Sequence, residues 1–366
     1  MLRNSPPRET KLLSALEEQL RSVLPQGWTF QANRGRPDQA FDLLLQLRGP
    51  DQTRAQVLVE AKRHVEPRDV PVIVQRLARF ERSAGAKAID RGRLVAAGYL
   101  SPRTRELLNE ANTGWFDATG NFQLHLNRPA LLIDRQGASR NPFTDAEDRR
   151  LRSLRGPGAA RVVRTLLDER GPLGVRDLAM RAEVGPATSS RVLELLARDD
   201  LVERDRRGAV TKVRKRSLAR RWAEDYGLTT TSNAVSVLAP RGIDRLVRDF
   251  AAYPQSYALT ASAAHRAYLP AGQASVAPLS LVAAFVDDAP AAIQDLHLRM
   301  ADRGANVLLI EPFDHVVYRN HCVKEQIRYV SVGQVVVDLL TGPGRSPEEG
   351  EQLLGVLADS DEEWAQ

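Results

Sequence analysis

Two apolar segments of strand length, separated by a short turn-forming segment, restrict the fold of the first third of the chain more than any other feature. FDLLLQL (41–47) and AQVLVEAK (55–62) flank RGPDQTR, which contains Gly and Pro. This pattern predicts two adjacent antiparallel strands. Leucines at helical spacing precede them, and strand patterns at 93–100 and 115–126 follow, the first before a helix opened by Ser101-Pro102. We therefore expect an α/β domain over residues 1–135.

Three ionisable residues lie at one end of this predicted hairpin. Asp42 begins the first strand and Glu60-Ala61-Lys62 ends the second. Antiparallel pairing brings Asp42 close to Glu60 and Lys62. Two carboxylates can hold Mg²⁺, and an ammonium group beside them can orient or deprotonate an attacking water and stabilise a pentavalent phosphate. The three are candidate catalytic residues if they share one face of the sheet and no arginine fills the space between the carboxylates.

The spacing Asp42…Glu60-x-Lys62 resembles the signature of PD-(D/E)XK nucleases over roughly residues 10–127. The resemblance implies a restriction-endonuclease-like α/β fold, Mg²⁺ as cofactor with Asp42 and Glu60 as its ligands, and a supporting Gln75 on the next helix, beside Arg76. Domains of this kind often lose activity and persist as DNA-binding or dimerising scaffolds. Glu60 and Lys62 can alternatively form only an exposed ion pair.

Two further positions enter through the same resemblance. Glu17 or Glu18 on the first helix is a candidate for an additional acid near the metal. Asp117-x-x-Gly120-Asn121 follows a later strand. We interpret Gly120-Asn121 first as a tight turn and only second as a substrate contact.

A polar segment rich in Gly, Pro and Arg, residues 136–158, is expected to be a linker. Three short helical patterns follow within 159–226, and Gly185-Pro186 forms the turn before the third. LVERDRRGAVTKVRK (201–215) then predicts two short strands around Gly208. The order of these elements predicts a winged helix-turn-helix.

Positive charge is densest at this hairpin and the helix after it, where nine Lys or Arg between Arg204 and Arg221 accompany one acid, Asp205. Such a block favours a polyanionic partner. The segment resembles winged-helix domains of bacterial transcription regulators, which implies base contacts by the third helix and phosphate contacts by the wing. A winged helix used for protein contacts is the alternative. The candidate DNA-binding residues are Thr188, Ser189, Ser190, Arg191, Arg204, Arg206, Arg207, Lys212, Arg214 and Lys215.

Residues 235–358 mix strand patterns (SYALTAS, LSLVAAFVDD, ANVLLIEPF) with helices and resemble the C-terminal domain of AbiEi-type antitoxins. The most specific part is the ending Asp338-Leu339-Leu340…Pro343-x-Arg345, and the resemblance implies a toxin or defence-system partner. A fainter resemblance to a nucleotidyltransferase core is degenerate, because Ala261-Ser262 replaces Gly-Ser. In addition, the consecutive Asp287-Asp288 point to opposite faces of a strand. We expect residues 359–366 to be a solvated acidic tail.

Composition narrows the remaining possibilities. No apolar run approaches the roughly 20 residues that span a bilayer, so we expect no membrane partner. The first residues have no signal-peptide pattern, so we expect a cytoplasmic, nucleoid-associated protein. The single cysteine, Cys322, excludes an internal disulfide and a Cys-based zinc cluster.

The sequence thus predicts an α/β and α+β multidomain protein. The leading hypothesis is a bacterial protein that binds double-stranded DNA, as a transcriptional regulator or a component of phage defence with a nuclease-like domain. The second is a Mg²⁺-dependent DNA endonuclease targeted by its winged helix. The third is an antitoxin that neutralises a toxin. A homodimer is compatible with each of these three hypotheses.

Overall fold

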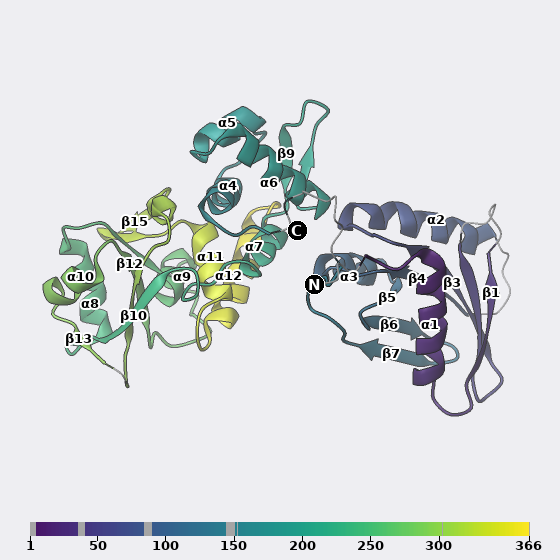
Figure 1. Cartoon of the computed structure of the whole chain (residues 1–366). Coiled ribbons are helices and arrows are strands. Elements are labelled where there is room, and N and C mark those ends of the chain that lie inside the picture. Colours follow the sequence, from purple (N-terminus) through teal and green to yellow (C-terminus); the bar gives the residue numbers. More distant parts are fainter. Residues whose placement is uncertain are drawn as a thin grey trace. The chain divides into compact units, whose positions relative to one another are not determined.

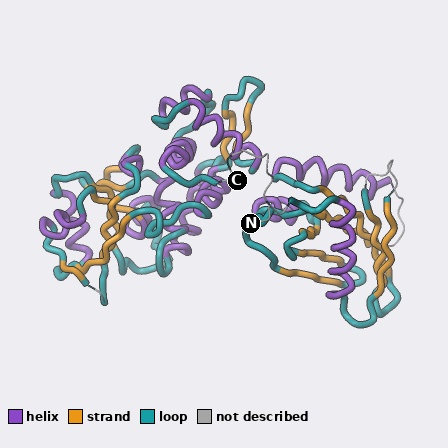
Figure 2. The backbone as a smooth tube through the Cα atoms, in the orientation of Figure 1, coloured by secondary structure: helices purple, strands orange, loops and turns teal. Residues whose placement is uncertain are grey.

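The computed structural model describes residues 5–35, 41–83, 90–143, 151, 153–301 and 303–365. By its contacts the chain divides into two compact units (Figure 1). The first comprises Met1–Arg149 with Arg198–Asp200, and the second comprises Arg150–Ala197 with Leu201–Gln366. Each unit is built on a sheet of its own, as the strand traces in Figure 2 show.

The sheet of the first unit follows chain order from β1 to β7. Its strands are β1 Thr29–Arg34, β2 Leu43–Arg48, β3 Arg54–Lys62, β4 Asp90–Ala97, β5 Gly114–Asp117, β6 Phe122–Leu126 and β7 Leu131–Arg135. The pairs β3–β4 and β4–β5 are parallel, and the other neighbours are antiparallel. The predicted hairpin of 41–47 and 55–62 is confirmed as β2–β3, with Asp42 just before β2. The segment 115–126 is a hairpin rather than one strand.

Helices cover both faces of this sheet. The helix α1 (Glu9–Val23) buries leucines at i, i+3, i+4 spacing against β2, β3 and β4, as an amphipathic helix does. The other face carries the 3₁₀ helix η1 (Pro67–Asp69), α2 (Val70–Ser83) and α3 (Pro102–Glu110), which enclose a second core. The predicted cap of α3 is present, because the Ser101 hydroxyl accepts from the Thr104 N–H at 3.1 Å. The unit is therefore a three-layer α/β sandwich.

The second unit begins with α4 (Pro157–Asp168), α5 (Val175–Arg181) and α6 (Pro186–Arg198). The strands β8 (Val202–Arg204) and β9 (Val210–Val213) pair as an antiparallel hairpin, and α7 (Lys215–Ala223) follows. Gly208 has a φ of 86° in the hairpin turn, which a residue without Cβ adopts without strain. These elements occur in the predicted order, although α4 begins two residues inside the expected linker.

The rest of the second unit is a mixed sheet in the order β13-β10-β14-β12-β11-β16-β15. Its strands are β10 Asn233–Leu238, β11 Tyr257–Thr260, β12 Val282–Val286, β13 Arg299–Met300, β14 Val307–Glu311, β15 Cys322–Lys324 and β16 Ile327–Tyr329. Its helices are α8 Ile243–Asp249, η2 Phe250–Ala252, α9 Ala261–Tyr268, α10 Ala289–Asp295, η3 His315–Tyr318, α11 Val332–Leu340 and α12 Ser346–Ser360.

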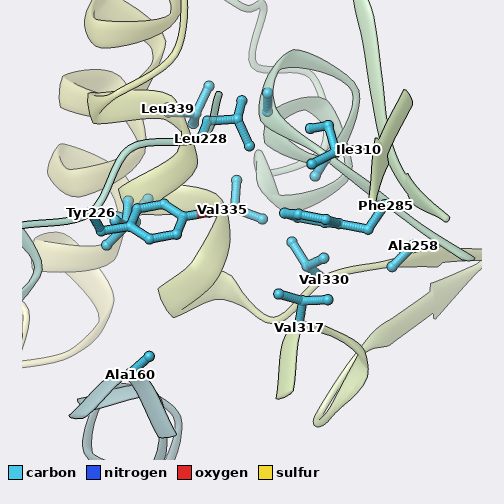
Figure 3. Close-up of a cluster of buried hydrophobic side chains, with 14 of the residues drawn as sticks. Ala160, Tyr226, Leu228, Ala258, Phe285, Ile310, Val317, Val330, Val335 and Leu339 are labelled. Carbon is cyan, nitrogen blue, oxygen red and sulfur yellow. The ribbon is translucent and has the colours of Figure 1, made fainter. Parts of the chain in front are cut away.

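One continuous hydrophobic core joins this sheet to the preceding helices. Ala160 of α4 lies in the same cluster as Tyr226, Phe285 of β12 and Val335 of α11 (Figure 3). The expected boundary between a domain of residues 159–226 and one of 235–358 therefore stays a prediction. Within the described residues, no helix is long and apolar enough to cross a membrane.

The expectation of a solvated acidic tail is wrong for the described residues after α12. Trp364 is 2% exposed and belongs to the core of the second unit. The Lys215 N–H donates to the Glu363 carbonyl at 2.8 Å, and Arg170 pairs with Asp361 at 2.9 Å. Burial of the indole stabilises this packing, and the neighbouring carboxylates stay exposed or paired, so the segment packs against α7 without desolvating an unpaired charge.

Candidate functional site

The end of the β2–β3 hairpin holds Asp42 against β3. Leu43 pairs with Val59 in the ladder, and Asp42 comes directly before β2. The Asp42 N–H donates to the Val59 carbonyl at 2.8 Å, and its Oδ2 accepts from the Ala61 N–H at 2.8 Å. The backbone of both strands thus holds the Asp42 carboxylate in place.

Two of the candidate catalytic side chains, Glu60 and Lys62, share one face of the sheet. Val57, Val59 and Ala61 of β3 belong to the core under α1, whereas Leu58 belongs to the core under α2. Because side chains alternate along a strand, Glu60 and Lys62 lie on the α2 face with Leu58. Asp42 precedes β2, and its carboxylate accepts from the Ala61 N–H, between Glu60 and Lys62 in sequence.

Glu60 is buried and has two cations at one oxygen. Its side chain is 2% exposed, and Oε1 lies 3.0 Å from the Lys62 Nζ. Arg76 of α2 also forms an ion pair with Oε1. The Lys62 Nζ lies 3.9 Å from Glu9 Oε1, in the first turn of α1. A buried carboxylate requires such compensation, because an unpaired charge in a protein interior is strongly unfavourable.

Arg76 and Glu9 contact this cluster in place of the predicted Gln75 and Glu17 or Glu18. Gln75 is exposed on α2, and its neighbour Arg76 is the residue that reaches Glu60. Glu17 is held by Arg34 at 2.7 Å, and Glu18 is exposed, so the acid that α1 brings to Lys62 is Glu9. The sequence alone could not identify Glu9, because its contact with Lys62 depends on how α1 packs against β3.

Asp117 and Asn121 are structural. Asp117 is fully buried and accepts hydrogen bonds from the N–H groups of Leu100 and Thr119 and from the Asn121 amide. Gly120 has a φ of 101° in the turn between β5 and β6. The interpretation of Gly120-Asn121 as a tight turn fits this geometry, and its donors leave Asp117 no open position.

The arrangement at Asp42 and Glu60 fits Mg²⁺ rather than a metal that needs an all-protein cage. In the described residues, no group of three or more His, Cys, Asp or Glu side chains could hold a metal ion. Mg²⁺ commonly takes one or two carboxylates and fills its remaining positions with water and substrate phosphate. Arg76 pairs with Glu60, and no ion pair joins it to Asp42 in the described part of the chain; that no arginine fills the space between the carboxylates stays a prediction.

The candidate DNA-binding residues separate into buried and exposed groups. Ser189 and Lys215 do not lie at the surface as expected of DNA-binding residues, because both are buried. The Lys215 Nζ donates to the Glu169 carbonyl and pairs with Glu363 at 3.0 Å. Arg204 donates to the Gly208 carbonyl within the hairpin, and Arg214 pairs with Glu203 at 3.0 Å. Both guanidinium groups are therefore already bound within the unit.

The exposed cations lie at the tip of the hairpin and on α6. Arg206 and Arg207 are exposed in the turn, which Asp205 Oδ1 fixes by accepting from the N–H groups of Arg207 and Ala209. Arg191 is exposed on α6, whereas Thr188, Ser190 and Lys212 are half-buried. Much of the basic block is neutralised within the unit: Arg220 pairs with Glu351 at 2.8 Å and Arg221 with Asp225 at 2.9 Å. Fewer exposed cations are therefore left for a polyanionic partner than the sequence indicates.

Two acidic residues from the segments that resembled an antitoxin and a nucleotidyltransferase, Asp338 and Asp288, also accept hydrogen bonds from other residues of the second unit. Asp338 of α11 is fully buried and accepts from Tyr226 at 2.7 Å, Thr260 at 2.5 Å and Gln334 at 2.7 Å. Burial raises the pKa of Asp338 to about 6 against these hydrogen bonds. Ala261 has a φ of 49°, and Asp288 caps α10 by accepting from the Ala291 N–H at 2.8 Å.

Comparison with known proteins supports the nuclease-like fold of the first unit. The family model for the Mrr catalytic domain, described as a restriction endonuclease, matches residues 14–118. Neither the curated proteins nor the solved structures contain a match to the chain. The matched residues include Asp42, Glu60 and Lys62. Residues 14–118 of this chain are therefore similar to a restriction-endonuclease domain.

Proposed function

We propose that this protein is a Mg²⁺-dependent DNA endonuclease. The observation that carries the proposal is the hydrogen bond that joins Asp42 to the end of β3, where Glu60 and Lys62 lie, within the segment that matches the restriction-endonuclease family. DNA is the substrate that this domain implies. The proposal goes further in assigning an active site and a divalent cation.

Each residue of the site has a distinct role. Asp42 and Glu60 would hold Mg²⁺, which when bound polarises a phosphoryl oxygen and lowers the pKa of a bound water. The Ala61 N–H orients the Asp42 carboxylate through Oδ2. Lys62, with its side chain 38% exposed, places a positive charge where solvent and substrate can reach it. That charge stabilises the negative charge that develops on the phosphate.

Cleavage of supercoiled plasmid tests this proposal. We expect Mg²⁺-dependent nicking or linearisation that a chelator abolishes, and we expect Asp42→Asn and Glu60→Gln to remove it. Asp51→Asn is a matched control, since Asp51 lies at the opposite end of the same hairpin and binds only Thr53 in the described residues. Cleavage by both site variants at the wild-type rate would contradict the assignment, provided that all variants unfold at similar temperatures.

The second unit supplies a candidate duplex-binding surface for this nuclease. The order α4, α5, α6, β8, β9 is that of a winged helix, and Arg206, Arg207 and Arg191 are among its exposed cations. A hairpin tip with two exposed guanidinium groups suits phosphate contacts, because guanidinium pairs well with phosphate oxygens. Binding of double-stranded DNA by this segment is compatible with the endonuclease and with a regulator or defence component. Neutralisation of a toxin by residues 235–358 stays a prediction.

A further inference from the structure

Both cations of the cluster around Glu60 already lie at this carboxylate before any metal is added. Asp42, Glu60 and Glu9 supply three negative charges, and Lys62 and Arg76 supply two positive charges. Glu60 is 1% exposed, so the interactions at its carboxylate act at a low effective dielectric constant. A divalent cation entering this cluster meets two cations already beside Glu60 Oε1, and entry is unfavourable unless one of them leaves.

Arg76 is the cation that can leave. Lys62 is two residues from Glu60 on the same strand and therefore stays on the same face of the sheet. Arg76 comes from α2, a different element, and its side chain is 46% exposed. Its long side chain can move to solvent without disturbing β3, and α2 carries a second exposed arginine, Arg79, one turn further on.

We propose that Arg76 is a gating residue that exchanges Glu60 for a DNA phosphate. In the metal-free protein Arg76 neutralises Glu60 and disfavours binding of a divalent cation. When DNA is present, its guanidinium pairs with a phosphate, and Glu60 Oε1 becomes available to the cation. Metal binding and DNA binding are thereby coupled, so a divalent cation is held mainly when substrate is bound. This inference rests on the proposed endonuclease function.

Titration with Mn²⁺, followed by electron paramagnetic resonance, tests the gate independently of cleavage. Full-length wild type, Arg76→Gln, Arg76→Lys and Arg79→Gln are each titrated without DNA and with a phosphorothioate duplex that resists cleavage. Arg79→Gln is the matched control, because it removes the same charge from the same helix and no ion pair joins Arg79 to Glu60 in the described residues.

Without DNA, we expect Arg76→Gln to bind Mn²⁺ at least ~10-fold more tightly than wild type, because one repelling charge next to Glu60 is gone. The duplex should strengthen Mn²⁺ binding clearly in wild type and Arg76→Lys, and much less in Arg76→Gln. Arg79→Gln should resemble wild type. Thermal unfolding of each variant verifies that the fold is kept.

Two results would overturn the gate and leave the endonuclease proposal standing. One is Mn²⁺ affinity in Arg76→Gln within twofold of wild type, and the other is an equal increase in Arg79→Gln. Absence of Mn²⁺ binding to every variant, with DNA or without it, overturns the metal site itself and both proposals with it. The two failures are therefore distinguishable in one set of titrations.

Discussion

Replacement of the two hairpin-tip arginines by alanine, Arg206→Ala with Arg207→Ala, should weaken duplex binding and change its salt dependence. Both side chains are exposed, and the turn that carries them is fixed by Asp205. If each contacts one phosphate, the log–log salt slope falls in magnitude by about 1.8, because one contact contributes about 0.9. Wild type should then lose about tenfold more affinity than the variant between 50 and 200 mM salt. At low salt, two charge-assisted contacts of about 1.5 kcal/mol each correspond to roughly a hundredfold in Kd.

Fluorescence anisotropy of a labelled duplex over a salt series measures both quantities. The matched control is Arg170→Ala with Arg220→Ala, which removes the same charge from the same unit. These arginines pair with Asp361 and Glu351, so the wild-type slope should persist. An equal change of slope in both double variants would refute the reasoning, because the effect would then reflect net charge and not contact by the hairpin tip.

Two further predictions concern α6 and the buried network at Asp338. Arg191→Ala should relax sequence preference more than total affinity, as measured by selection from a random duplex library, and an equal loss for all sequences would show that Arg191 contacts only backbone. The pKa of Asp338 rises from 3.8 unfolded to about 6 folded, so its protonated form stabilises the fold below about pH 4. That stability, on the order of 3 kcal/mol, is lost as pH rises through 6. Asp338→Asn should remove this part of the pH dependence of chemical unfolding, and an unchanged pH profile would contradict the assignment.

The sequence pattern was sufficient to predict the helices and strands whose apolar side chains recur at a regular spacing. The β2–β3 hairpin and the helices α4 to α6 follow from spacing, because burial in those elements has a fixed period, and the Ser101 cap of α3 follows from the residue types at its start. The strands β1 and β7 were not predicted. They lie at the edges of the sheet and carry few buried residues, so their pattern is weak.

The candidate site shows the same limit. Asp42, Glu60 and Lys62 could be grouped from two neighbouring strands, but Arg76 and Glu9 join them through helix packing that no spacing in the sequence encodes. The basic block was also misjudged in part. Composition counts charges, and it cannot tell an exposed Arg206 from a Lys215 that is buried against Glu363. Pairing between distant segments decides which charges remain available.

Single-turnover cleavage by Lys62→Ala tests the central claim most directly. Removal of this ammonium group should lower the Mg²⁺-dependent cleavage rate by at least ~100-fold, as loss of a group that acts in proton transfer or charge stabilisation does. Mn²⁺ and duplex affinities should stay near wild type, because Lys62 is not a metal ligand. Arg63→Ala, a change of the exposed neighbouring residue, should cleave normally. Cleavage by Lys62→Ala at the wild-type rate would contradict the account, as would a wild-type protein that binds duplex and Mn²⁺ but leaves plasmid intact.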